Sequence, residues 1–256
     1  MTPWSSPAGW PAAPRPRKTL GVLGGMGPAA TAEFLRLLTV ESPARTDQEH
    51  PRLLLLSEPG IPDRSAALLA GRDDPQAHLW EGLLLLAQWG ADFLAVPCNT
   101  AHAFIEHFAG DLPVPLVHIV DATLREAMRG SPGGGWLAAT TGTVLNGLYQ
   151  RRARELGYPL HVPDAAIQSR VQRASVLVKA GRVPDAGRLF LTAVHGMWRR
   201  HRLPVLAACT ELPIAYTAAG LPPEYMVSSL RALAVACLGN LYGEARTPGA
   251  EAGRTV

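Results

Sequence analysis

One recurring pattern constrains the fold of this chain more than any other. An apolar run at Phe93 to Val96 leads into Cys98-Asn99-Thr100, and a helical segment is expected to follow, with Asn99 or Thr100 as its N-cap. Far along the chain, a second apolar run at Val205 to Ala208 leads into Cys209-Thr210-Glu211, again before a helical segment. A buried strand followed by a helix is the basic unit of a parallel α/β sheet. The repeat therefore predicts two half-sites, each with a thiol at the end of a strand.

Strand-like and helix-like patterns alternate along most of the chain. Short apolar runs predict strands at 19–23, 52–56, 93–96, 116–120, 136–139 and 204–208. Helical patterns occupy 29–40, 64–70, 75–90, 122–128, a stretch from 143 to about 156, 165–180, 184–202 and 229–242. Strands joined through helices form parallel sheets with right-handed crossovers, and ligands bind beyond the carboxyl ends of such strands. The sequence thus predicts an α/β fold with its site at those ends.

Composition narrows the class of protein. The 256 residues are 47% hydrophobic and 18% charged, with no apolar run near the length of a membrane span. The net charge of +3, from 24 basic and 21 acidic residues, is too balanced to argue for nucleic acid as a partner. Residues 1–18 and 244–256 are expected to be disordered, and the Pro-rich start lacks the apolar core of a secretory signal.

The cysteine count argues for reduced thiols. Cys98, Cys209 and Cys237 form an odd set without close spacing, which does not fit a disulfide framework or a zinc knuckle. We therefore expect a cytoplasmic protein. Cys237 lies in an apolar helical pattern and is expected in the core, and no residue cluster has the spacing of a metal site.

A pair of thiols at equivalent strand ends suggests acid/base chemistry. A lone cysteine in such a place is usually a small core residue. Here both halves carry one, and nearby helix N–H groups are expected to lower the pKa of each thiol toward neutrality. Two such groups on opposite sides of a substrate can act as a two-base pair, in which one removes a proton from carbon and the other delivers one.

Several other motifs leave alternatives open. Gly25-Met-Gly27-Pro-Ala-Ala30 matches the dinucleotide fingerprint, although the acidic residue expected at the end of the second strand comes late, at Glu58, and Pro28 lacks an N–H. A glycine turn that admits a small anion is the competing interpretation. The Thr140, Thr141 and Thr143 turn either caps a helix or holds a carboxylate.

Two basic residues are candidates for binding an acidic ligand. Arg64 follows Pro62-Asp63 at a strand exit and could clamp a carboxylate with two hydrogen bonds. Lys179 is one of only two lysines in a chain that otherwise uses arginine. His102, just after the first cysteine, is expected to pack or to cap a helix rather than to ligate a metal.

Seven sequence blocks together resemble a known family. They are Gly24-Gly-Met-Gly-Pro-Ala-Ala-Thr31, Asp47-Gln-Glu-His-Pro51, Ile61-Pro-Asp-Arg64, Pro97-Cys-Asn-Thr-Ala-His102, Ala139-Thr-Thr-Gly-Thr143, Val178-Lys-Ala-Gly181 and Cys209-Thr-Glu211. In this order, over about residues 19–242, they resemble the pyridoxal-phosphate-independent aspartate racemases of the aspartate/glutamate racemase superfamily.

The resemblance implies a fold and a domain division. It implies two similar three-layer α/β domains with four-stranded parallel sheets, related by a pseudo-twofold axis, with the active site in the cleft between them. The first domain would comprise 19–120 together with 224–243, and the second 121–223. A homodimer is also implied.

The resemblance also implies a site. Cys98 and Cys209 would be the acid/base residues, and Arg64 and Lys179 would grip the side-chain carboxylate. The α-carboxylate would be held by Asn99, Thr100 and Ala101 with Thr140, Thr141 and Thr143, and the substrate-binding set is completed by Met26, Thr210 and Glu211. The implied reaction is the interconversion of L- and D-aspartate without a cofactor or a metal, with an acidic amino acid as the only partner besides the second subunit.

Two departures from the family pattern keep alternatives in view. Glu58-Pro-Gly60 stands where the family often has amides, and Ala208 replaces a glycine before the second cysteine. These changes favour, as an alternative, a superfamily relative that acts on another carboxylate, such as a glutamate racemase, an epimerase or a biosynthetic enzyme. A nucleotide-dependent oxidoreductase and a catalytically silent binding protein for acidic amino acids are further alternatives.

Overall fold

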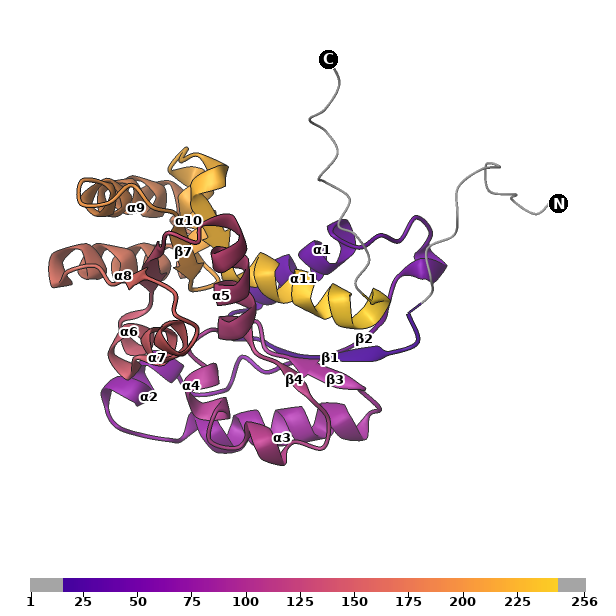
Figure 1. The fold of residues 1–256 in the computed structure, drawn as a ribbon. Coiled ribbons are helices and arrows are strands. Elements are labelled where there is room, and N and C mark those ends of the chain that lie inside the picture. The colour runs from indigo at the N-terminus through magenta and orange to yellow at the C-terminus, as the bar shows by residue number, and fades with distance from the viewer. Residues whose placement is uncertain (1–15, 244–256) are drawn as a thin grey trace, which may run out of the picture.

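Two four-stranded parallel sheets form the frame of the molecule (Figure 1). The computed structural model describes residues 16–243, so the predicted tail and the first 15 residues of the predicted extension lie outside the described residues. The strand order is β2-β1-β3-β4 in the first sheet and β6-β5-β7-β8 in the second. The second order repeats the first, which confirms the predicted fold of two similar α/β halves.

The two central strands of each sheet are buried on both faces. The first sheet contains β1 (Thr19–Gly24), β2 (Arg52–Ser57), β3 (Phe93–Ala95) and β4 (Leu116–Val117), and the second contains β5 (Gly135–Ala139), β6 (Leu160–His161), β7 (Val205–Ala208) and β8 (Met226–Ser228). Every residue of β1, β3, β5 and β7 is buried. Helices cover both faces of a parallel sheet, which is why these central strands are continuous apolar runs.

The first sheet lies between helices. Its half comprises α1 (Pro28–Val40), α2 (Arg64–Leu69), α3 (Pro75–Gln88), α4 (His102–Ile105) and the C-terminal α11 (Ser229–Tyr242), with 3-10 turns at Asp47–Glu49 and Ala109–Asp111. Figure 1 shows α1 and α11 on one face of the sheet and α3 on the other. Pro28 and Pro75 begin their helices in the first turn, where a missing N–H costs no hydrogen bond.

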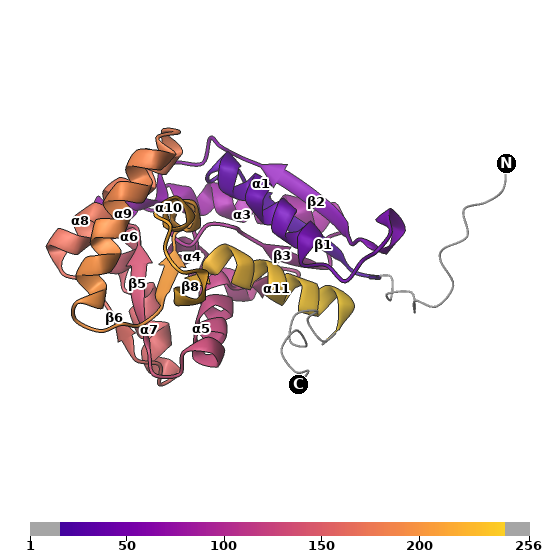
Figure 2. The same cartoon turned by 90° about the horizontal axis from the view of Figure 1, so that it is seen from above.

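The second sheet is covered in the same way. Its helices are α5 (Ile119–Gly130), α6 (Thr141–Asn146), α7 (Leu148–Glu155), α8 (Ala165–Lys179), α9 (Val183–Trp198) and α10 (Leu212–Ala218), with a 3-10 turn at Pro223–Tyr225. In Figure 2, α8 and α9 form the outer side of this half. Alternate residues of β5 face opposite layers: Trp136 and Ala138 pack with α8 and α9, whereas Leu137 and Ala139 pack with α5 and α7.

One apolar cluster joins the two halves. It takes Leu20 from β1, Leu137 from β5, Leu206 from β7, Leu124 from α5 and Leu233 from α11, all fully buried. We call this cluster, with its other members in the same layer, the shared core. Because it contains side chains from both sheets, the two sheets are fixed against one another by apolar burial, and so are the two strand ends that carry the cysteines.

The structure corrects several predicted boundaries. The strands Leu160–His161 and Met226–Ser228 were not predicted, because they are too short and only partly buried to leave an apolar pattern. Since Met226–Ser228 pairs with β7, the predicted return to the first domain at residue 224 is too early. The predicted strand 116–120 ends at Val117, and the helix expected to reach about 156 is broken at Gly147, where φ is +76°.

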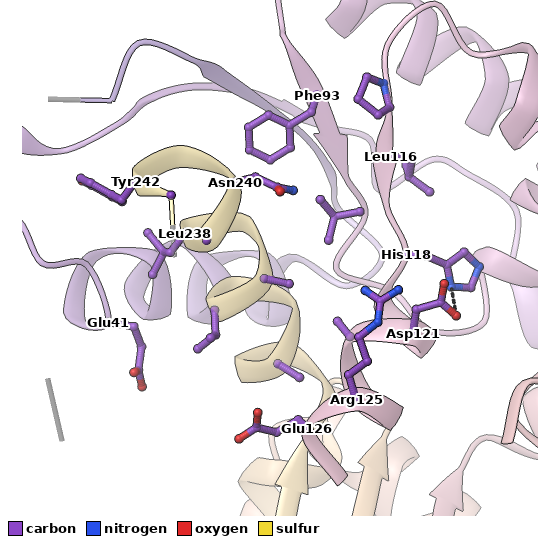
Figure 3. Close-up of a pocket in the computed structure, with 18 of the residues that line it drawn as sticks. Glu41, Phe93, Leu116, His118, Asp121, Arg125, Glu126, Leu238, Asn240 and Tyr242 are labelled. Atoms are coloured by element: carbon purple, nitrogen blue, oxygen red, sulfur yellow. Dashed lines mark ion pairs between the residues drawn. The ribbon is translucent and has the colours of Figure 1, made fainter. Parts of the chain in front are cut away.

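A surface groove lies beside α11 and is distinct from the strand ends with the cysteines. It has a volume of about 760 Å³ and runs between α11, β4 and the start of α5, and none of the predicted site residues lines it. Figure 3 shows His118 and Asp121 at one side of this groove and Tyr242 of α11 at the other.

Within residues 16–243, no helix has the length and apolar character needed to cross a membrane.

Candidate active site

Cys98 and Cys209 line the same small cavity. Cys98 follows β3 and Cys209 follows β7, so both lie at carboxyl ends of central strands, where only 7% and 5% of each residue is exposed. The cavity has a volume of about 20 Å³, room for little more than one water molecule. It is lined by Met26, Asp63, Arg64, Ser65, Cys98, Asn99, Thr100, Thr140, Lys179, Cys209, Thr210 and Glu211.

Cys209 lies in a hydrogen-bonded pocket of its own. Its thiol donates to Glu211 Oε2 over 3.0 Å, and Ser175 Oγ lies 3.2 Å from Sγ. Burial, together with the Glu211 carboxylate, raises the pKa of the Cys209 thiol well above its usual value. The prediction of a lowered pKa is therefore wrong for this residue. The short helix α10 begins only at Leu212, and the Glu211 carboxylate contacts the thiol instead.

Cys98 is held through its backbone. Its carbonyl oxygen accepts a hydrogen bond from His102 Nδ1 over 2.9 Å, and His102 Nε2 in turn accepts the Ile119 N–H over 3.4 Å. Burial, with His118 nearby, lowers the pKa of His102 well below its usual value. A neutral His102 with its proton on Nδ1 satisfies both contacts. His102 is fully buried and its ring packs against that of His118, as the predicted packing role requires.

Asn99 does not cap a helix. The helix α4 starts at His102 with Ala101 as its N-cap and without a side-chain cap, so the predicted capping by Asn99 or Thr100 is wrong. Asn99 instead accepts a hydrogen bond from the Tyr149 hydroxyl over 2.6 Å and donates one to Ser229 Oγ over 2.9 Å. Both ends of the amide are thus fixed by side chains from the second half and from α11.

Three threonines form a hydroxyl cluster across the two halves. Thr100 Oγ1 lies 3.1 Å from Thr140 Oγ1 and 2.9 Å from Thr143 Oγ1. Thr140 also caps α6 by accepting the Thr143 N–H. Thr141 is not part of this cluster. Its N–H donates to Gln172 and its hydroxyl contacts Gln168, both on α8. Of the predicted carboxylate-binding set, Thr141, Thr143 and Ala101 do not line the cavity.

Arg64 is positioned by backbone carbonyls. Its Nη1 donates to Ile61 O over 2.9 Å and to Pro62 O over 3.0 Å, and its Nη2 donates to Met26 O over 3.3 Å. Arg64 Nε is buried and has no hydrogen-bond partner among the described residues. The guanidinium is thus fixed in the wall of the cavity by three hydrogen bonds, and its buried Nε–H is left unpaired within the described residues.

Lys179 brings a second positive charge to the cavity from the end of α8. The residue is exposed overall, but its side chain lines the cavity. Burial of the ammonium disfavours its charge, yet the Glu211 carboxylate, the two site thiols and Asp63 outweigh this, and the pKa of Lys179 is raised. Met26, Thr210 and Glu211, also predicted to bind substrate, line the cavity as well.

Sequence reasoning missed several residues of the site. Asp63 and Ser65 flank Arg64 and line the cavity, and Asp63 caps α2 by accepting the Ala66 N–H over 2.8 Å. Ser175 lies four residues before Lys179 on α8, so the spacing of a helical face could have identified it. Tyr149 contacts Asn99 because the fold brings together residues 50 positions apart, and no local sequence pattern predicts this contact.

The glycine turn after β1 is closed by its own helix. Thr31 Oγ1 accepts the Gly25 N–H over 2.9 Å and donates to Gly27 O over 3.0 Å. Gly25 has φ of +90° and packs against the backbone of Glu58, which leaves no space for a side chain. The Glu58 residue itself is exposed and lies outside the cavity lining, so this departure from the family pattern does not place a carboxylate in the site.

Ala208, the second departure, has a structural explanation. It is fully buried in the shared core, whereas Cys209 belongs to the apolar cluster on the other side of the sheet. Successive side chains of a strand point to opposite faces, so the Ala208 methyl packs away from the thiol.

The fold is shared with α/β racemases of known structure. The family model described as Asp/Glu/Hydantoin racemase matches residues 23–237, and the chain belongs to this family. This confirms the resemblance read from the sequence blocks. At the level that the family defines, the protein is a racemase, an isomerase that inverts a stereocentre.

Individual relatives extend the comparison. The structure of Picrophilus torridus aspartate racemase is 30% identical, with a TM-score of 0.76 over 88% of this chain and 94% of that one. The broad specificity amino-acid racemase RacX of Bacillus subtilis is 27% identical over 199 residues, which is 75% of this chain and 85% of RacX. Glutamate racemase isoform RacE1 from Bacillus anthracis, at 18% identity and a TM-score of 0.63, covers 89% of this chain and 82% of its own and shares the fold.

Proposed function

We propose that this protein interconverts L- and D-aspartate without a cofactor, with Cys98 and Cys209 as the two acid/base residues. The observation that carries the proposal is the placement of two buried thiols, from equivalent strand ends, in the wall of one cavity that also contains Arg64 and Lys179. One thiol removes the α-proton and the other delivers a proton to the opposite face, which inverts the stereocentre.

The reaction needs stabilisation of a developing carbanion. The α-proton of an amino acid is weakly acidic, so charge that moves into the α-carboxylate during proton removal must meet fixed donors. The hydroxyls of Thr100 and Thr140 line the cavity, and the threonine cluster holds them in place before substrate arrives. We assign the α-carboxylate to this side of the cavity, with Asn99 held behind it by Tyr149 and Ser229.

A second carboxylate is the substrate feature that best explains Arg64. Three backbone carbonyls fix its guanidinium, and the buried Nε–H lacks a partner in the described part of the chain. A buried donor without a partner is costly, and a carboxylate oxygen would satisfy it with a charge-assisted hydrogen bond. Lys179 adds a second cation on the same cavity. Both features favour an acidic amino acid over a neutral one.

The cavity as it stands is too small for the substrate. At about 20 Å³ it holds little more than a water molecule, whereas aspartate has nine heavy atoms, about nine times as many as water. Entry therefore requires the lining to move apart. The partly exposed residues at the end of α8 and in α2 are the part of the lining that can do so.

A second candidate function is racemisation of several amino acids. The similarity to RacX, whose name gives it broad specificity, favours this candidate. The two candidates share the cysteine chemistry. They differ in whether the Arg64 side of the cavity requires a carboxylate on the substrate side chain. Glutamate keeps the second carboxylate of aspartate but has one more methylene, so it lies between aspartate and the neutral amino acids as a test of the Arg64 side.

A substrate panel separates these candidates. We expect the purified, reduced protein to racemise aspartate in preference to glutamate, alanine and lysine. The reactions contain no cofactor, and the enantiomers are separated and measured by chiral chromatography. In Arg64→Gln, the KM for aspartate should rise about 10- to 100-fold, because a charge-assisted bond is lost. Arg36→Gln, which removes an exposed partner of Glu33, is the matched control and should leave KM unchanged. Equal rates on aspartate and neutral amino acids would favour the broad-specificity candidate.

A further inference from the structure

The two site cysteines differ in their surroundings although their places in the fold are equivalent. Cys98 follows β3, which lies next to β1, and Cys209 follows β7, which lies next to β5. Each residue is nearly fully buried, at 7% and 5% exposure. Burial therefore does not distinguish Cys98 from Cys209. What distinguishes them is the residue two positions later in the chain, which is Thr100 in one half and Glu211 in the other.

Glu211 brings a carboxylate against one thiol only. Its Oε2 atom accepts a hydrogen bond from the Cys209 thiol over 3.0 Å and another from the Thr210 hydroxyl over 3.3 Å, and the residue is 5% exposed. A carboxylate at hydrogen-bond distance favours the protonated thiol, because a thiolate there would face a second negative charge in a buried site. The raised pKa of Cys209 has this cause in addition to burial.

Thr100 places no charge beside Cys98. Its hydroxyl is engaged by Thr140 and Thr143, and Cys98 Sγ has no hydrogen-bond partner among residues 16–243. The other charged groups that line the cavity are Asp63 and Arg64 from the first half and Lys179 from α8. Lys179 interacts electrostatically with both thiols, so it does not favour a thiolate at Cys98 alone. Glu211 is the charged group that makes the difference.

We propose that Glu211 is a positioning residue that keeps the proton on Cys209, so that the resting enzyme carries a thiol at Cys209 and the proton-accepting group at Cys98. This inference rests on the proposed function. Glu211, which the sequence resemblance placed among the substrate-binding residues, would then act through Cys209 and not through the substrate.

The proton balance of the reaction follows from this assignment. In the first half of the cycle, the Cys98 thiolate takes the α-proton and becomes a thiol, and the electron pair of the broken C–H bond stays on the substrate as a carbanion. The Cys209 thiol then gives its proton to the opposite face and becomes a thiolate beside Glu211. Return to the resting form needs only transfer of one proton from Cys98 to water and of one from water to Cys209.

The test is a thiolate titration that does not depend on turnover. Thiolate formation is followed by ultraviolet absorbance in two full-length variants, C209S/C237S, which retains Cys98, and C98S/C237S, which retains Cys209. Removing Cys237 leaves one thiol to titrate in each. We expect Cys209 to form its thiolate at a higher pH than Cys98, because only Cys209 contacts a carboxylate. Adding E211Q should lower the apparent pKa of Cys209 by more than about one unit and leave that of Cys98 unchanged. Glu58→Gln, an exposed carboxylate outside the cavity, is the control and should change neither.

Two results would overturn the proposal: the same titration midpoint for both thiols, or a Cys209 midpoint that E211Q does not lower. If E211Q does not fold, alkylation of the wild-type protein at pH 8, resolved by peptide mass spectrometry, decides the matter, since Cys98 must then react well before Cys209. Because no substrate is present, failure of this test is distinct from failure of the proposed racemisation, which the substrate panel measures.

Discussion

At the scale of single residues, the site depends on polar side chains that lie behind the cysteines. Asn99 follows Cys98 directly, and the Tyr149 hydroxyl donates to its Oδ1 atom over 2.6 Å. Both residues are buried, so water does not replace the bond when it is lost. An unpaired buried acceptor costs more than the hydrogen bond itself contributes.

Tyr149→Phe should therefore lower both stability and activity. We expect a loss of about 1–3 kcal/mol in the free energy of unfolding, measured with urea, and a fall in kcat that exceeds any change in KM. Tyr158→Phe is the matched control, because its hydroxyl is buried without a hydrogen-bond partner among the described residues and its removal should be neutral or stabilising. Equal effects of the two substitutions would show that Tyr149 contributes only its ring.

At the scale of elements, the junction between α6 and α7 controls the threonine cluster. Thr140 caps α6, Thr143 lies in its first turn, and Gly147 ends the helix with φ of +76°. This left-handed conformation is unfavourable for residues with a Cβ atom. The turn thus sets the length of α6 and the direction of α7, which carries Tyr149.

Gly147→Ala tests this junction. The substitution should cost about 1–2 kcal/mol in stability, because the added Cβ opposes the positive φ. Gly239→Ala, in the exposed part of α11 with no atoms near the added Cβ, should instead stabilise by about 0.5–1 kcal/mol. Thermal unfolding of both variants provides the comparison. The account of the junction fails if the two substitutions shift Tm in the same direction.

The elements also show how far local sequence determines the fold. Strands such as β1 and β7 were predictable because both faces are buried and nearly every residue is apolar. The edge strands β6 and β8 were not, because their few residues are only partly buried and pair through backbone groups that any sequence provides. The break at Gly147 was hidden because both flanking segments continue a helical pattern.

The candidate site divides in the same way. The two cysteines were predictable because each follows an apolar run, and Arg64 because it follows a turn. The contact of Glu211 with Cys209 was not, although the two are close in the sequence, because it depends on where the strand ends and on burial by α8. The acid/base and substrate-binding roles of these residues stay predictions.

At the scale of the whole molecule, buried histidines link stability to pH. Burial, with Arg152 nearby, lowers the pKa of His118 from 6.5 to about 4. Burial lowers the pKa of His102, whose ring contacts that of His118, in the same direction. The unfolded chain therefore binds these protons at a higher pH than the folded protein does.

The folded state should accordingly lose stability as the pH falls from about 6.5 to about 4, with no further loss from His118 below that range. For His118 alone the loss is at most about 3 kcal/mol. In His118→Asn, urea unfolding at pH 7 and at pH 4.5 should show a smaller difference than in the wild type. His78→Asn, at an exposed position, is the control. An unchanged difference in His118→Asn would contradict this account.

The shared core gives the molecule its overall arrangement. Since one apolar cluster contains residues of both sheets, the strand ends that carry the two cysteines are held relative to one another by apolar burial, without a disulfide bond between Cys98 and Cys209. The homodimer and the cytoplasmic location expected from the sequence stay predictions, and so does the division into two domains apart from the corrected position of Met226–Ser228.

The central claim is that Cys98 and Cys209 exchange the α-proton of aspartate from opposite sides. The most direct measurement incubates the reduced protein with L-aspartate in D₂O, without a cofactor, and follows both enantiomers by chiral chromatography and mass spectrometry. We predict that D-aspartate forms with deuterium at the α-carbon while the remaining L-aspartate is at first unlabelled, and that Cys98→Ala and Cys209→Ala each abolish racemisation. Full activity in either single variant, or D-aspartate without deuterium, would contradict the account.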